Sequence, residues 1–165
     1  MQHLAQSAGA AREPAADMAD LAEVIQALMA VEAGRDIIMR LGGHLFDVVI
    51  TGSGFRARAV VALMDGIQGG CGPVIEDPRN RWFYWLVPPG SADRWESHTH
   101  AVCLGFPHTI TLPSVNRRMP PGPYWHRPSA SDRLVPLGPL CEALGQLRPE
   151  PTPHTTLAAR LGIAL

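Results

Sequence analysis

The sequence predicts an α+β domain in which helices cover a mainly antiparallel sheet. The strongest of three observations is a β-hairpin, in which two apolar runs flank the turn Asp77-Pro78-Arg79-Asn80. Asp77 can bond the turn backbone, Pro78 fixes φ at the second turn position, and Asn80 tolerates left-handed geometry. The second run, Trp82–Val87, is apolar on both alternating sets of positions. This pattern is typical of a central strand that is covered on both faces.

The second observation is an amphipathic helix that follows Ser53, which can cap it, and that Gly69-Gly70 can end. Its expected buried residues follow the helical i, i+3, i+4, i+7 spacing: Val60, Leu63, Met64 and Ile67. We expect this helix to cover a sheet in which Val74-Ile75 pairs antiparallel with Phe83–Leu86. The third observation is the order strand, strand, helix, strand, strand, with further strands after it.

The remaining elements are predicted from short patterns along the chain. Helical spacing predicts a first helix at roughly 15–33. Two β-prone runs, 37–39 and 46–50, are separated by Gly42-Gly43 and predict a second strand pair. Beyond the hairpin we expect a helical turn at 92–96, strands near 100–104 and 108–112, a short edge strand at 124–126 and a closing helix at 137–147.

Length and composition predict one domain. The chain has 165 residues and 46% hydrophobic content, which is enough for one hydrophobic core. We expect a disordered tail at 1–13, a single α+β domain at 14–147, and a Pro-rich linker with a C-terminal tail or short helix at 148–165. All 14 basic residues are arginine, and Gly and Pro each occur 16 times, a bias typical of a GC-rich bacterial genome.

Charge and cysteine content narrow the expected partners and compartment. The formal net charge is −1, so no global field recruits nucleic acid, and any such contact needs a local basic patch. Three widely spaced cysteines without a C-x-x-C motif predict neither a disulfide framework nor a zinc ribbon, and a reducing cytoplasm fits them best. No long apolar run or signal peptide is seen, so we expect no membrane partner.

Metal-binding and acidic residues give only weak site candidates. His98, His100, Cys103 and His108 cluster within a short stretch, and imidazole and thiolate suit zinc. In a strand, however, residues 98 and 100 share one face while 103 points away, so we expect polar residues at a strand start, with no metal and no cofactor. Asp47 is an acidic residue inside an apolar strand. A strand-edge carboxylate facing water is the favoured interpretation, and a functional one is the alternative.

Arginines next to aromatic residues are candidates for binding a nucleotide or nucleic acid. Arg79 and Arg81 lie beside Trp82 and Tyr84, a combination that on an exposed sheet can hold a phosphate and stack a base. We favour a core role for the aromatic residues, because they bury a large area. The pair Arg117-Arg118 is another basic spot.

No nucleophile elbow, phosphate-binding loop or dinucleotide motif is present. The stretch Thr51-Gly52-Ser53-Gly54 is too short to count as one. It is a turn before a helix N-terminus, where an anion can sit.

The order of segments from about 24 to 147 resembles the bifunctional DNA primase/polymerase N-terminal domain, of the archaeo-eukaryotic primase type. The segments that carry the resemblance are Gly42-Gly43, Phe46–Ile50, a helix, Gly72–Val74, Arg81–Tyr84 and His108–Ser114. The resemblance implies a primase-polymerase or RRM-like core, here without most of the family's upstream part.

The resemblance also implies a two-metal site for building nucleotide chains. Its Asp-x-Asp falls near Thr51 and Ser53, its later acidic residue on Ala101, and its phosphate-contacting His on Trp82. Two metal ions need several carboxylates to offset their charge, and these residues supply none. Asp47 is the remaining acidic residue of that strand.

Three interpretations follow. The first is a degenerate, non-catalytic primase-polymerase-like domain with weak binding of a nucleotide or of single-stranded nucleic acid. The second is a protein-interaction or regulatory module that contacts its partner through the Pro-rich segment 113–128. The third is a nucleotidyl transferase that uses Asp47 with His98 or His100.

Overall fold

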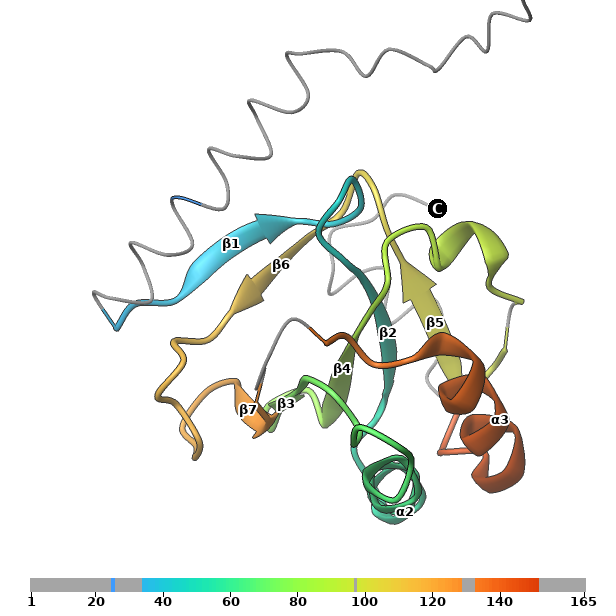
Figure 1. Ribbon diagram of the computed structural model, residues 1–165. Helices are drawn as coiled ribbons and strands as arrows, with labels where there is room; N and C mark the ends of the chain where they lie inside the picture. The colour runs from blue at the N-terminus through green and yellow to red at the C-terminus, as the bar shows by residue number, and fades with distance from the viewer. Residues whose placement is uncertain (1–24, 26–33, 97, 129–132, 152–165) are drawn as a thin grey trace, which may run out of the picture.

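Antiparallel strands form two sheets in this computed structural model, which describes residues 25, 34–96, 98–128 and 133–151. The larger sheet has the strand order β5-β2-β4-β3-β7, and β1 pairs with β6 in the smaller one. The strands are β1 Ile37–Arg40, β2 Asp47–Gly52, β3 Val74–Asp77, β4 Trp82–Val87, β5 Ala101–Leu104, β6 Thr109–Leu112 and β7 Tyr124–Arg127. The helices are α2 Phe55–Asp65, the 3₁₀ turn η1 Ala92–Arg94 and α3 Leu137–Leu147. Helices therefore pack on an antiparallel sheet, and the predicted α+β class is confirmed (Figure 1).

The central strand is β4, which is buried at every position. Phe83, Trp85 and Val87 face the helices, while Trp82, Tyr84 and Leu86 belong to a second core on the other face. The pleat of a strand sends successive side chains to opposite faces, so a strand with two apolar faces needs a cover on each. The prediction of a doubly covered central strand is confirmed.

The β3–β4 hairpin has the predicted register, with Val74 opposite Trp85 and Ile75 opposite Tyr84. In the turn, the Asp77 carboxylate accepts the backbone N–H groups of Arg79 and Asn80 at 3.1 and 3.2 Å, as expected for an aspartate that begins a turn. The left-handed residue is Arg81, with φ +57°, and not Asn80.

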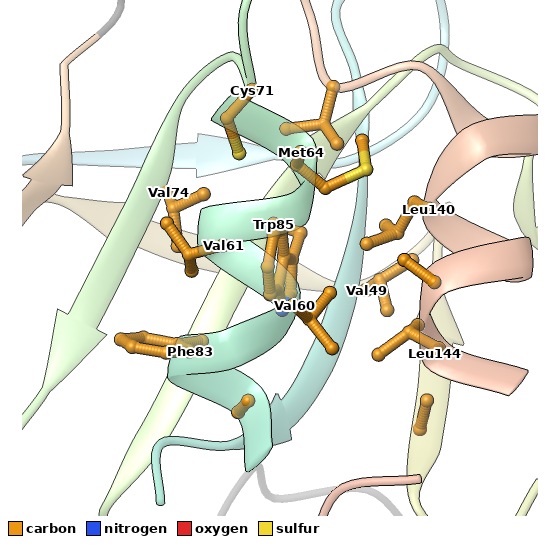
Figure 2. Close-up of a cluster of buried hydrophobic side chains, with 14 of the residues drawn as sticks. Val49, Val60, Val61, Met64, Cys71, Val74, Phe83, Trp85, Leu140 and Leu144 are labelled. Carbon is orange, nitrogen blue, oxygen red and sulfur yellow. The ribbon is translucent and has the colours of Figure 1, made fainter. Parts of the chain in front are cut away.

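Helices α2 and α3 cover one face of the large sheet, and their apolar side chains meet those of β2, β3 and β4 around Trp85 (Figure 2). The sheet-facing residues of α2 are Ala57, Val60, Val61 and Met64. Leu63, which was predicted to be buried, is 46% exposed. The buried stripe begins at the small residue Ala57, which the sequence pattern omitted, and this rotation carries Leu63 to the flank of the helix.

The ends of α2 also differ from the prediction. Gly54, and not Ser53, is the N-cap, and no side-chain cap bond is made there. The helix ends at Asp65, with Gly66 as the C-cap, before it reaches Gly69-Gly70.

The other face of the large sheet is covered by the β1–β6 pair (Figure 1). The predicted pairing of 37–39 with 46–50 is wrong, because β1 pairs with β6 and β2 lies between β4 and β5. A single bridge joins Gly42 to Phe46. Gly42 and Gly43 both have positive φ, which glycine adopts readily, and the chain turns there out of the β1 layer into the sheet.

The helical turn at 92–94, the strands β5, β6 and β7, and helix α3 at 137–147 confirm the predicted elements in those regions. In the large sheet β7 is an edge strand, as expected. The predicted helix at 15–33 lies almost entirely outside the described residues, and the segments 1–13 and 155–165 lie wholly outside them. Within the described part of the chain, no helix has the length and apolar character needed to cross a membrane.

Candidate functional site at the turn between β2 and α2

The ends of three neighbouring strands, β2, β4 and β5, lie side by side at one end of the large sheet. Gly52 at the end of β2 lies opposite Trp82 at the start of β4, and Thr51 lies opposite Ala101 at the start of β5. Helix α2 begins three residues after β2 ends. A pocket of about 410 Å³, called the β2–α2 pocket below, opens here and is lined by Gly52, Ser53, Gly54, Arg81, Trp82, Glu150 and Pro151.

The left-handed backbone of Arg81 joins the hairpin to this turn. The Arg81 carbonyl accepts the backbone N–H of Ser53 at 2.9 Å. A non-glycine residue with positive φ is uncommon, and such strain tends to gather at functional sites. The Arg81 side chain is exposed and contributes to the pocket wall.

The N-terminus of α2 forms another wall of the pocket. Its N-cap, Gly54, has no side chain, and its first turn contains no acidic residue. The first backbone N–H groups of a helix lack partners within the helix, and they give that end a partial positive charge. The Glu150 carboxylate lies close to Gly54. A Cβ atom placed on Gly54 would be 2.7 Å from Glu150 Oε2.

Arg81 lines the pocket, and three further arginines lie within two residues of pocket-lining positions in the sequence. Arg56 lies in the first turn of α2, Arg79 in the hairpin turn and Arg148 directly after α3, and all three are exposed. Phe55, the first residue of α2, is 85% exposed.

The positions that the family resemblance assigns to metal ligands have other roles. Thr51 is fully buried, and its Oγ1 accepts the indole N–H of Trp85 at 3.0 Å and donates to the Gly52 carbonyl at 2.9 Å. Ala101 is buried in the core beneath the helices. Ser53 lines the pocket but brings no carboxylate.

Trp82 and Tyr84 are buried on the face away from the helices, with their rings in an edge-on arrangement 6.5 Å apart. The core role favoured for them is confirmed, and neither ring forms an open stacking surface. Trp82 still contributes to the pocket wall, while the Tyr84 hydroxyl donates to Asp77 at 3.3 Å. The exposed aromatic residue at this edge is Phe55, which the sequence analysis did not consider.

Asp47 lies at the opposite end of β2, about 16 Å from Gly52 at the usual strand rise. It is buried, and its Oδ2 accepts the N–H of Ala92 at 2.9 Å, which fixes the η1 turn. The expectation that Asp47 faces water is therefore wrong. Its Oδ1 has no hydrogen-bond partner among the described residues.

His98 and His100 precede β5 at the end of the sheet far from Asp47, so the two histidines and Asp47 do not form one site. The imidazole rings stack 4.9 Å apart. Burial, and then His98 and Arg148, lower the pKa of His100. Cys103 packs against the core under the helices, where burial raises its pKa to about 12. Across the described ranges, no three His, Cys, Asp or Glu side chains gather as a metal site.

Arg117-Arg118 lies in the loop between β6 and β7. Arg117 is 3.5 Å from the Asp36 carboxylate, just before β1, and its carbonyl accepts the N–H of Trp125. Arg118 is exposed. Arg117 therefore contacts the residue before β1, and it does not line the β2–α2 pocket.

A second polar cluster surrounds the buried Glu76, a residue that the sequence analysis did not consider. Arg58 and the Tyr124 hydroxyl donate to the two carboxylate oxygens, and His126 Nδ1 lies 3.6 Å from one of them. Burial raises the pKa of Tyr124 and lowers that of His126. The alternation of β3 contained the signal, because it puts Glu76 on the same face as the buried Val74. Both oxygens have partners, and the cluster links β3 to α2 and to β7.

Comparisons of the chain with protein-family models, with curated proteins and with solved structures found no match. The resemblance to primase-polymerase domains therefore stays a prediction. What the β2–α2 pocket can bind follows from its own groups, which are a helix N-terminus, an exposed guanidinium and a single carboxylate from after α3.

Proposed function

We propose that this protein is a non-catalytic, primase-polymerase-like domain that binds a phosphate group of a nucleotide or of single-stranded nucleic acid in the β2–α2 pocket. The observation that carries the proposal is the exposed Arg81 side chain and the N-terminus of the 11-residue helix α2 on the walls of one pocket. Backbone N–H groups at a helix N-terminus favour anions, and a guanidinium hydrogen-bonds phosphate oxygens in a fixed geometry.

The groups around the pocket suit binding better than polymerisation. Nucleotide transfer by two metal ions needs several carboxylates at one place. The corresponding positions are Thr51, Ser53 and Ala101, and Glu150 is the acidic residue that lines the pocket. A single carboxylate leaves most of the charge of two divalent cations without compensation.

The expected affinity is modest and depends on salt. Arg81 lines the pocket, and Arg56, Arg79 and Arg148 are exposed and lie within two residues of a lining residue in the sequence, so a strand gains at most a few phosphate contacts. Each phosphate contact contributes roughly 0.7 to 0.9 to the slope of log affinity against log salt concentration. The total slope should therefore be about −2 to −4. The exposed ring of Phe55 is available to stack one base, which adds affinity without sequence preference.

The test is fluorescence anisotropy at low salt with two probes, a labelled oligothymidylate strand and a fluorescent adenosine triphosphate. Arg81→Ala should weaken binding about tenfold, the usual order of effect for a charged hydrogen bond. The exposed Arg118→Ala, which removes the same charge elsewhere, should change little. Binding of the strand alone or of the nucleotide alone identifies the source of the phosphate. Absence of binding at low salt, or equal losses in both variants, would contradict the proposal.

The second candidate function is protein interaction through the segment 113–128. It is favoured by Val115 and Met119, which are exposed apolar residues within this Pro-rich loop. Such a loop can present an extended, already ordered chain to an aromatic-lined groove. This alternative predicts that neither phosphate probe binds, and that substitution of Met119 by Ser weakens association with the partner.

A further inference from the structure

A second pocket lies at the opposite end of α2, where the chain passes from the helix to β3. Its volume is about 200 Å³, below the roughly 300–1,000 Å³ of sites for drug-sized molecules, so it suits a small ligand. It is called the Arg133 pocket below. The described residues that line it are Asp65, Gly69, Gly70, Cys71, Gly72, Arg127, Pro128 and Arg133. None of these residues lines the β2–α2 pocket.

The glycine loop after α2 makes room for the Arg133 side chain. A Cβ on Gly69 would lie 1.7 Å from Arg133 Nη1, so the guanidinium lies directly against the loop. Gly69 also has φ +88°, a value that glycine adopts readily. A Cβ on Gly72 would lie 2.9 Å from the backbone nitrogen of Val135, so the chain after Arg133 packs against the same loop.

The two arginines of the pocket differ in their partners. Arg127 donates from Nε and Nη2 to the two carboxylate oxygens of Asp65, at 3.0 and 2.7 Å. Arg133 Nε is buried and has no hydrogen-bond partner among the described residues. A buried N–H without an acceptor costs free energy, and more so on a charged group. The Nε–Nη2 edge that holds a carboxylate on Arg127 is therefore unused at Nε on Arg133.

The charges of the pocket favour a singly charged anion. Two arginines and one aspartate give it a net charge of +1. Burial raises the pKa of Cys71 to about 12, although Arg127 and Arg133 lower it, so the thiol stays neutral and does not act as the anion. A doubly charged phosphate would keep one uncompensated charge and would face Asp65. A carboxylate balances the pocket, and its planar pair of oxygens matches a guanidinium edge.

We propose that the Arg133 pocket binds the carboxylate group of a small organic acid, with its two oxygens on the Nε–Nη2 edge of Arg133. This inference does not depend on the phosphate-binding function proposed above. Arg133 is only partly buried and has a long, flexible side chain, so this edge can turn to the ligand without movement of the backbone. Acetate, which makes little contact beyond this pair, should bind with a Kd of about 1–10 mM.

The test is a nitrogen-15 NMR titration with acetate at pH 7.5, in which sodium acetate replaces sodium chloride at constant ionic strength. The amide signals of residues 69–72 and the side-chain Nε–H signal of Arg133 should shift and saturate. Arg133→Gln should raise the Kd at least about tenfold, because it removes a charged hydrogen-bonding group. The matched control is Arg118→Gln, which changes an exposed arginine outside the pocket and should bind acetate like wild type.

Arg133→Lys keeps the charge and removes the planar edge, so it should also weaken binding, and it decides the matter if Arg133→Gln does not fold. Shifts that do not saturate, or an unchanged Kd in either Arg133 variant, would refute the site.

Titrations with dimethyl phosphate and inorganic phosphate test the ligand class, and tighter binding of either one than of acetate would overturn the carboxylate assignment. Arg81→Ala separates this inference from the proposed function, because it should bind acetate like wild type even where it loses the phosphate probes. Loss of acetate binding in Arg81→Ala would contradict a separate site.

Discussion

The backbone N–H of Ser53 donates to the carbonyl of Arg81 across 2.9 Å, and this bond connects the turn before α2 to the tip of the β3–β4 hairpin. Arg81 makes the bond from a left-handed conformation, with φ +57°. One residue thus supplies both a strained backbone and an exposed guanidinium. Substitutions that treat the two features separately can show what each contributes.

Arg81→Gly should lower phosphate affinity as much as Arg81→Ala, but its free energy of unfolding should be unchanged or higher by up to about 1 kcal/mol. Glycine adopts positive φ without steric cost, although it gains entropy in the unfolded chain. Arg81→Val should instead destabilise the protein, because a β-branched residue fits this conformation poorly. Urea denaturation of the three variants measures the difference. A Val variant as stable as the Gly variant would disprove the strain at this position.

Thr51→Val should cost about 1–3 kcal/mol of unfolding free energy, because it leaves the buried indole N–H of Trp85 without its acceptor. In a Trp85→Phe background there is no indole N–H that could be left without an acceptor, so the same substitution should cost much less. A double-mutant cycle by chemical denaturation gives this coupling. Equal penalties in both backgrounds would mean that the hydroxyl has no structural role.

The sequence predicted the elements of the large sheet better than the partners of its strands. The alternation of Trp82–Val87 and the turn chemistry of Asp77 are local, so the hairpin and its register followed from neighbouring residues. The pairing of β1 with β6 joins segments about seventy residues apart along the chain. No local pattern specifies it, and the Gly42-Gly43 turn favoured the wrong partner.

The candidate site was predicted in part. Arg81 and the turn before α2, which both line the pocket, were recognised, because each has a local signature. Glu150 was not, since it reaches the pocket only because packing brings the end of α3 to the start of α2. Asp47 was misjudged because its partner, the Ala92 amide, comes from a distant turn.

Met64→Ala should cost about 2–5 kcal/mol of unfolding free energy, because Met64 is buried between α2 and the sheet. Leu63→Ala should change the same quantity by about 0.5 kcal/mol or less, since Leu63 is substantially exposed. Denaturation midpoints of the two variants check the rotation of α2. A larger loss for Leu63→Ala than for Met64→Ala would restore the burial pattern that the sequence suggested.

Stability should decline as the pH falls below the normal histidine range. Burial, and then Arg127, lower the pKa of His126 in the folded protein, while the nearby carboxylates of Glu76 and Asp65 raise it less. In the unfolded chain the pKa is about 6.5, so the unfolded state binds more protons below that pH. The unfolding free energy should therefore fall as the pH is lowered from about 7 towards 5. His100, whose pKa is also lowered, contributes in the same direction.

The His126 contribution is isolated by comparing wild type with His126→Gln across this pH range. The variant should lose less stability than wild type between pH 7 and pH 5, even if it is less stable at pH 7 through loss of the ring that stacks on Phe83. Parallel pH profiles would assign the acid sensitivity to other groups.

The purified protein should not extend a labelled primer in the presence of Mg²⁺ or Mn²⁺, because Thr51, Ser53 and Ala101 supply no carboxylate to hold two metal ions. Glu150 and Asp47 do not repair this deficit, since the first is a single group in the pocket and the second is buried at the far end of β2. Gel electrophoresis of the primer over a range of metal concentrations is the measurement. Template-dependent extension that disappears in Glu150→Gln but persists in Glu142→Gln would make the β2–α2 pocket an active site and overturn the non-catalytic interpretation.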